Sequence, residues 1–144
     1  MKYTGDKSFA SIIEAKEFLK AYDQYEKYNV GRLAVINKTE NRFIGWCGLK
    51  YSQNVNEYDI GFRFFRKYWN KGYATETSKA CIDFGFRKLG LNKIIGRAMK
   101  ENIASIKVLE KIGLIYMKDF DFDRHSGVIY EITKNKYEQT IANR

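Results

Sequence analysis

The sequence predicts a mixed α/β or α+β domain with a partly antiparallel sheet. Its 144 residues are most simply one domain, long enough to bury a core. Hydrophobic residues make up 44% of the chain and charged residues 30%, which is typical of globular proteins rather than disordered ones. Runs with strand-like alternation and runs with helical spacing follow one another in the order α-β-β-β-α-β-α-β-β. Helices inserted between strands indicate the mixed class.

The first part of the chain is predicted to form one helix and three strands. Residues 8–28 carry apolar side chains at mainly three- and four-residue steps, and Ser11 followed by Glu14 resembles a capping box at the helix start. Apolar, β-branched and aromatic runs then indicate strands, the first two joined as a hairpin by the polar link TEN. These runs are residues 31–38, 42–50 and 57–65.

The second part begins with a helix from about Gly72 to Lys88, which Gly90 ends. A strand and a short helix follow, and the helix has Asn102 as a natural N-cap and Gly113 as its C-terminal stop. The last two strands form a hairpin around the turn DFDRHS. In order, the later elements are the strand 92–99, the helix 102–113 and the strands 114–120 and 127–134.

Composition excludes several classes of protein. No apolar run approaches the ~20 residues of a membrane span, and the first residues do not resemble a secretory signal. Cys47 and Cys81 lie in apolar runs without metal spacing, so we expect reduced, buried thiols in a cytoplasmic protein and no metal site. The net charge of +9 suits nucleic acid, an anionic cofactor or an acidic partner, but no block of five like charges appears, which favours solvated faces.

The stretch RKYWNKGYATE, residues 66–76, joins a predicted strand to a predicted helix. Unpaired N–H groups and the positive end of the helix dipole converge at such a join, which makes it an anion site. Gly72 lets the backbone approach the anion, and Lys67 and Lys71 add positive charge. The pattern is neither a P-loop nor GxGxxG. By itself, one glycine in a basic turn is also compatible with an ordinary turn.

Two segments together carry a family resemblance: YDIGFRFFRKYWNKGYATE and, further on, NKIIGRAMKENIASIKVLEKIGLIY. They resemble the GNAT acyltransferase superfamily, and within it the RimJ/RimL-like branch that acetylates amino groups. The resemblance runs from about Tyr3 to the final strand. It implies a single acyltransferase domain over residues 1–144, with a mostly antiparallel sheet, a splayed central strand and flanking helices.

The resemblance also implies a coenzyme site for acetyl-CoA. The family's phosphate loop begins with Arg or Gln, where this chain has Trp69, and Asn70 stands where the branch usually has Gly. Asn tolerates left-handed backbone geometry. The family holds the pantetheine arm as an added strand, and one N–H of the splayed strand polarises the thioester carbonyl. Carried over to this chain, the pyrophosphate lies on the amides of Asn70, Lys71, Gly72, Tyr73 and Ala74, and the arm lies along Phe62, Arg63 and Phe64.

Ser105 is the candidate general acid, because NIAS matches the family's Asn-x-x-Ser, whose serine approaches the coenzyme sulfur. The tyrosine that many relatives use as the acid is replaced here by Leu109. A serine at a helix start is also often a capping residue. Asn102 matches a coenzyme-contacting asparagine of the family, and a plain N-cap is the alternative for it.

Glu57 and Asp59, near the start of the splayed strand, are the candidate general bases. The alternative is a solvated strand end. Glu76 is explained by charge–dipole stabilisation in the first helical turn. His125 lies in the predicted last turn and is a weaker candidate for substrate contact, despite its suitable pKa.

We therefore expect an acetyl-CoA-dependent N-acetyltransferase that acts on a primary amine, either a protein N-terminus or a small molecule. Because the family tyrosine is missing, a non-catalytic acyl-CoA-binding or regulatory module remains an alternative. A nucleic-acid-binding domain would explain the charge of +9, but the sequence lacks a recognition motif. Aromatic residues able to line an acceptor groove are equally able to form core: Tyr22, Tyr25, Tyr28, Trp46 and Tyr51.

Members of this branch usually carry a first strand and a first helix before the segment that resembles residues 3–28. Their absence here would leave Gly31–Lys38 as an open sheet edge. We expect a second copy of the chain to cover this edge, as a homodimer, or the natural gene to begin further upstream.

Overall fold

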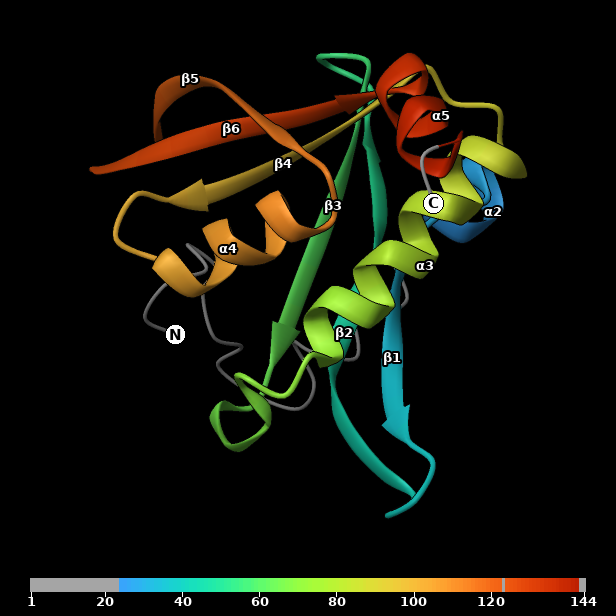
Figure 1. Ribbon diagram of the computed structural model, residues 1–144, viewed down its shortest axis with the longest axis vertical. Helices are drawn as coiled ribbons and strands as arrows, with labels where there is room; N and C mark the ends of the chain where they lie inside the picture. The colour runs from blue at the N-terminus through green and yellow to red at the C-terminus, as the bar shows by residue number, and fades with distance from the viewer. Residues whose placement is uncertain (1–23, 123, 143–144) are drawn as a thin grey trace.

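The computed structural model describes residues 24–122 and 124–142, without the side chains of residues 25 and 122. The strands form one six-stranded sheet in the order β1-β2-β3-β4-β6-β5 (Figure 1). All neighbouring strands are antiparallel except β3 and β4, which run parallel. The elements are α2 (Gln24–Tyr28), β1 (Arg32–Asn37), β2 (Arg42–Ser52), β3 (Glu57–Phe64), the 3-10 helix η1 (Arg66–Tyr68), α3 (Tyr73–Arg87), β4 (Lys93–Met99), α4 (Ile103–Lys111), β5 (Ile115–Phe122), β6 (His125–Thr133) and α5 (Lys134–Ala142).

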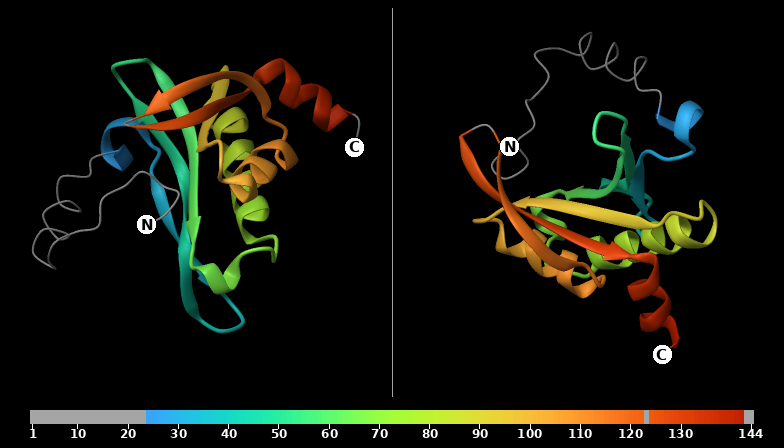
Figure 2. Two further views of the ribbon diagram at one scale, coloured as in Figure 1. Left: turned by 90° about the vertical axis from the view of Figure 1, so that its left-hand side faces the viewer. Right: turned by 90° about the horizontal axis from the view of Figure 1, so that it is seen from above.

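The predicted fold class is confirmed, since a mostly antiparallel sheet carries helices α3 and α4 on one face (Figure 2). The core lies between this face and the two helices. Ile60 of β3 and Ile82 of α3 are 3% and 2% exposed within it. Side chains alternate along a strand, so the neighbours of Ile60 in β3 point to the opposite face. Among the helices of residues 24–142, none has the length and apolar character needed to cross a membrane.

Asparagine shapes the connections between elements. Among residues 24–122 and 124–142, four non-glycine residues have positive φ, and all four are asparagines at or beside turns. Asn tolerates this left-handed geometry because its short polar side chain bonds locally. They are Asn29 (59°), Asn41 (53°), Asn56 (51°) and Asn70 (61°). The predicted hairpin link around residues 39–41 is therefore confirmed, and Asn70 has the left-handed geometry that asparagine tolerates.

Three sequence predictions need correction or fall outside the description. Helix α5 was missed, although Thr133 caps it by accepting the Lys136 N–H (3.2 Å). The last hairpin is tighter than predicted, because His125 is the first residue of β6, in register with Phe122, and does not lie in a turn. Of the predicted first helix, residues 24–28 are helical, whereas its start and the Ser11–Glu14 capping box lie outside the described residues, as does the expectation of missing family elements before it.

Glycines in strands β2 and β3 allow close approach of the neighbouring chain, and Gly48→Ala is expected to be strongly destabilising. A methyl group at residue 48 would overlap the carbonyl oxygen of Gly31 and lie 2.8 Å from the Cα of Arg32, and neither backbone atom can yield without moving strand β1. We expect a loss of about 3 kcal/mol and a Tm lower by roughly 10 °C in thermal unfolding.

Gly85→Ala is the matched control, since the nearest neighbours of its methyl would be the side-chain ends of Ile94 (2.9 Å), Leu49 (3.0 Å) and Leu91 (3.3 Å), which can shift. In α3, alanine also gains about 1 kcal/mol of helix propensity over glycine. A Gly85→Ala variant that loses as much stability as Gly48→Ala would contradict the explanation from backbone overlap.

Candidate active site

The two parallel strands in the middle of the sheet, β3 and β4, splay apart, and this separation of their backbones is called the β3–β4 gap. Strands β3 and β4 share one registered pair, Asp59 with Ile95, and diverge beyond it toward their C-terminal ends (Figure 1). The expected splay of the central strand is thus present. Phe62, Arg63 and Phe64, the residues predicted to hold the coenzyme arm, form the β3 side of the gap. In parallel arrangements, ligands bind in crevices beyond the carboxyl ends of the strands, and this gap opens at that end.

The loop after β3 has the geometry of an anion site. Gly72 is the N-cap of α3 with φ 86°, and no side chain of a described residue caps the helix. The first helical hydrogen bond runs from the Glu76 N–H to the Gly72 carbonyl (2.9 Å), so the three preceding helical N–H groups, of residues 73–75, have no helical acceptor. A Cβ added at Gly72 would meet nothing within 4 Å, so the backbone there is open to a ligand.

Trp69 anchors the start of this loop. Its indole Nε1–H donates to the carbonyl of Phe64 at 2.8 Å, which ties the loop to the end of β3. The Arg66 guanidinium lies 5.5 Å from the Trp69 ring, and the Lys67 ammonium lies 5.0 Å from the Tyr68 ring. Lys71 and Asn70 are exposed beside Gly72. The loop therefore presents positive charge around an uncapped helix N-terminus.

The start of α4 lies at the end of β4, on the other side of the gap. Asn102 is its N-cap, because its Oδ1 accepts the Ser105 N–H at 3.2 Å, so the N-cap interpretation of Asn102 is confirmed. Ser105 is the third helical residue and does not cap the helix. The residue is half-buried, and its hydroxyl makes no hydrogen bond with a described residue. The Ser105 hydroxyl therefore does not stabilise the fold through a hydrogen bond to any residue that the structure describes.

Glu57 and Asp59 lie at the closed end of the gap, on the face opposite α3 and α4. Asp59 Oδ1 is 2.5 Å from Arg32 Nη2, and Asp59 Oδ2 is 3.9 Å from Arg97 Nη1. Glu57 Oε2 is 3.2 Å from Arg97 Nη2. The two carboxylates are only 24% and 15% exposed, respectively, so they form a partly buried ion-pair cluster and not a freely solvated strand end.

The two arginines of this cluster were not anticipated from the sequence. Arg32 donates to the carbonyls of Gly48 (2.6 Å) and Asp59 (3.1 Å), and its guanidinium covers Gly61, where a Cβ would lie 2.5 Å from Arg32 Cζ. Gly48 and Gly61 are in register on neighbouring strands, which leaves room for the guanidinium. Glycines inside strands mark close approach, and this was the available sequence signal. No group of three or more His, Cys, Asp or Glu side chains among residues 24–122 and 124–142 is arranged to hold a metal.

Comparison with known proteins agrees with this geometry. The profile of a family described as Acetyltransferase (GNAT) domain matches residues 1–115 of the chain. The chain belongs to the GNAT acetyltransferase family. A GNAT-family acetyltransferase of Bacillus anthracis has a similar structure, with a TM-score of 0.77 and 28% identity over 94% of this chain and 81% of that chain.

Two Bacillus subtilis (strain 168) proteins are also similar to this GNAT chain. YkkB is 35% identical over 108 residues, which cover 73% of this chain and 63% of YkkB. YnaD, named as an N-acetyltransferase, is 33% identical over 118 residues, which cover 78% of this chain and 69% of YnaD. The chain thus spans about two thirds of the length of these relatives. Within the GNAT framework, the gap between β3 and β4 and the loop at Gly72 form the candidate site.

Proposed function

We propose that this chain is an acetyl-CoA-dependent N-acetyltransferase that transfers an acetyl group to a primary amine by direct attack on the thioester. The observation that carries the proposal is that β3, whose C-terminal end diverges from β4, leads through η1 directly to the uncapped N-terminus of α3 at Gly72. An extended arm that ends in a pyrophosphate fits such a combination, since a strand edge binds the arm and helix amides bind the anion.

In this proposal the coenzyme contacts three parts of the chain. The amides of residues 70–74 bind the pyrophosphate, and the backbone of residues 62–64 pairs with the pantetheine amides. The start of α4, which carries Asn102 and Ser105, follows β4, whereas the phosphate loop follows β3. Both therefore lie beside the open end of the gap.

The chemistry needs a nucleophilic attack, stabilisation of the oxyanion, cleavage of the C–S bond and the accompanying proton transfers. The neutral amine nitrogen attacks the thioester carbonyl carbon, one N–H of residues 62–64 stabilises the oxyanion, and the C–S bond then breaks. A base takes one proton from the substrate ammonium before the attack. As the C–S bond breaks, Ser105 gives its hydroxyl proton to the departing thiolate and regains one, through water, from the positively charged nitrogen. We assign the role of general base to Glu57, acting directly or through water. Its carboxylate is more exposed than that of Asp59, and it pairs with one arginine, whereas the Asp59 carboxylate pairs with two arginines.

The two carboxylates are expected to respond differently to loss of charge. Asp59→Asn should lower the free energy of unfolding by about 2 kcal/mol, because it removes the carboxylate partner of the partly buried Arg32 guanidinium, and thermal unfolding measures this loss.

The Glu57→Gln variant should fold normally. Its kcat/KM should be lower by roughly 10–10²-fold in the low-pH part of the pH–rate profile, where the substrate ammonium must be deprotonated. An Asp59→Asn variant of wild-type stability, or a Glu57→Gln variant with the wild-type pH–rate profile, would reverse the respective assignment.

Narrower features of the function rest on the motif residues. The GYATE and NIAS segments support the RimJ/RimL-like branch, with a protein N-terminus or a small amine as the acceptor. Two thiols without a disulfide fit a reducing compartment such as the cytoplasm.

Strand β1 lies at one end of the sheet order and exposes two apolar side chains, Leu33 (54%) and Ile36 (50%). Such an edge supports a homodimer in which a second copy covers β1, and light scattering measures the mass of that dimer.

One set of measurements tests the main proposal. Calorimetry with acetyl-CoA should show binding, and a screen of amino acids, polyamines, aminoglycosides and peptides with free N-termini should show acetylation by mass spectrometry. Acetyl-CoA binding without turnover of any acceptor would favour the non-catalytic acyl-CoA-binding module. Retention on heparin that vanishes with salt, without acetyl-CoA binding, would favour nucleic acid.

A further inference from the structure

Two thiols that are distant in sequence lie in contact between strand β2 and helix α3. Cys47 lies on β2 and Cys81 on α3, 34 residues apart, with their sulfurs at 3.9 Å. The Ser78 Oγ lies 3.5 Å from the Cys47 sulfur. Cys47 is 2% exposed, as the sequence predicts, whereas Cys81 is only partly buried. Neither thiol belongs to the proposed coenzyme site.

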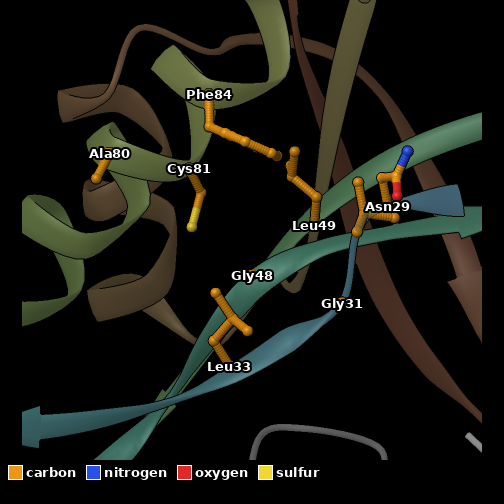
Figure 3. Close-up of a pocket in the computed structure, with 9 residues that line it drawn as sticks. Asn29, Gly31, Leu33, Gly48, Leu49, Ala80, Cys81 and Phe84 are labelled. Atoms are coloured by element: carbon orange, nitrogen blue, oxygen red, sulfur yellow. The ribbon is translucent and has the colours of Figure 1, made fainter. Parts of the chain in front are cut away.

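An apolar cavity reaches Cys81, the more exposed member of the pair. It has a volume of about 290 Å³ and lies between α3, strand β2 and the start of β1, with Cys81 in its wall (Figure 3). Phe84 and Leu33, at 44% and 54% exposure, line it from opposite sides. A water molecule occupies about 30 Å³, so a hydroperoxide of similar size fits easily.

The surroundings of the pair favour the state in which Cys47 is a thiolate and Cys81 keeps its proton. A hydrogen bond from the Cys81 S–H to a Cys47 thiolate, together with the Ser78 hydroxyl and the nearby Arg32 charge, lowers the pKa of Cys47 against the opposing effect of burial. Donation of its hydrogen to Cys47 and burial raise the pKa of Cys81. The pair therefore loses its first proton readily and its second with difficulty. A thiolate is the nucleophile in thiol oxidation, and a neighbouring thiol is needed to resolve the product.

We propose that Cys47 and Cys81 are a redox modification site, at which a hydroperoxide forms an intramolecular disulfide between β2 and α3. One thiolate of the pair attacks a peroxide oxygen, the O–O bond breaks, and sulfenic acid and hydroxide form. The second thiol then attacks the sulfenic sulfur, the S–S bond forms, and water leaves. Two thiols and one hydrogen peroxide thus give one disulfide and two waters. The sulfurs must close from 3.9 Å to about 2 Å, which joins the strand to the helix.

The test uses the whole chain and hydrogen peroxide. Intact-mass spectrometry should show loss of two hydrogen atoms, and tryptic digestion should release peptides 43–50 and 80–87 joined by a bond that dithiothreitol cleaves. Between pH 7 and pH 8 the oxidation rate should rise less than that of an ordinary exposed thiol, because the pKa for loss of the first proton is lowered. Retention of both free thiols, or oxidation only to disulfide-linked dimers, would overturn the proposal.

Cys81→Ser is the matched variant, because it changes one atom at a partly exposed position and leaves Cys47 in place. We expect its remaining thiol to oxidise at least roughly tenfold more slowly at pH 7, with gain of oxygen and no linked peptides, since the stabilising S–H donor and the resolving thiol are both gone. Oxidation of this variant at the wild-type rate would show that the pair does not act as a unit. Neither outcome depends on whether the chain binds acetyl-CoA.

Discussion

Gly72→Asp is expected to abolish acetyl-CoA binding while the fold survives. The residue is the N-cap of α3, and the helical N–H groups beside it have no helical acceptor. A carboxylate at this position would accept those N–H groups itself and repel the pyrophosphate. Like-charge contact costs several kcal/mol, so calorimetry should show affinity lower by roughly 10²-fold or more.

Gly90→Asp is the matched control at the other end of the same helix. Gly90 also has a left-handed φ, 65°, and a Cβ there would also meet nothing within 4 Å. Both substitutions therefore carry a similar backbone strain, but only residue 72 faces the proposed anion. Equal loss of affinity in both variants, or a folded Gly72→Asp variant with unchanged affinity, would remove the pyrophosphate site from residues 70–74.

Ser105→Ala is expected to lower kcat by roughly 10–10³-fold with little change in acetyl-CoA affinity. The residue is half-buried, and its hydroxyl makes no hydrogen bond to any residue that the structure describes, so removal of the hydroxyl should not weaken the helix. The Ser105 N–H remains on the Asn102 side chain in the variant, because that bond uses the backbone. A steady-state assay with the best acceptor and calorimetry with acetyl-CoA separate the two effects.

Asn102→Ala provides the comparison, because it removes the N-cap and leaves the serine hydroxyl. It should cost about 1 kcal/mol of stability, measured by thermal unfolding, through loss of the bond to the Ser105 N–H. If Asn102→Ala reduced kcat strongly while Ser105→Ala retained the wild-type rate, the serine would have no role as an acid.

Features that depend on neighbouring residues were predictable from the sequence. The Asn102 cap, the Gly72 helix start and the left-handed Asn70 all follow from local backbone preferences, and each lies where it was expected. The order of the three strands and the helix before residue 90 followed from the period of apolar residues. The splay between β3 and β4 followed only from the family resemblance, because periodicity does not say how far two parallel strands stay paired.

Features that depend on distant residues were not predictable in this way. Arg32 and Arg97 come from β1 and β4, and only the folded sheet brings them to Glu57 and Asp59. The contact between Cys47 and Cys81 likewise depends on the packing of α3 on β2. Helix α5 has a weak apolar pattern, with Tyr137 as its buried residue.

The position of α5 is set by tertiary contacts. The Tyr137 hydroxyl donates to Asp83 at 2.6 Å, and its ring stacks on Phe86 at 4.7 Å between centroids. Tertiary packing of this kind, more than helix propensity, stabilises a short polar helix.

The single registered pair between β3 and β4 also divides the sheet into two halves. One half is the meander β1-β2-β3, closed by short local turns, and the other is β4 with the β5–β6 hairpin. Cooperative unfolding units often coincide with such local motifs, so amide hydrogens in the two halves should exchange with different opening free energies. A coenzyme arm that fills the gap would hydrogen-bond across the division, and the chain would then exchange as one unit.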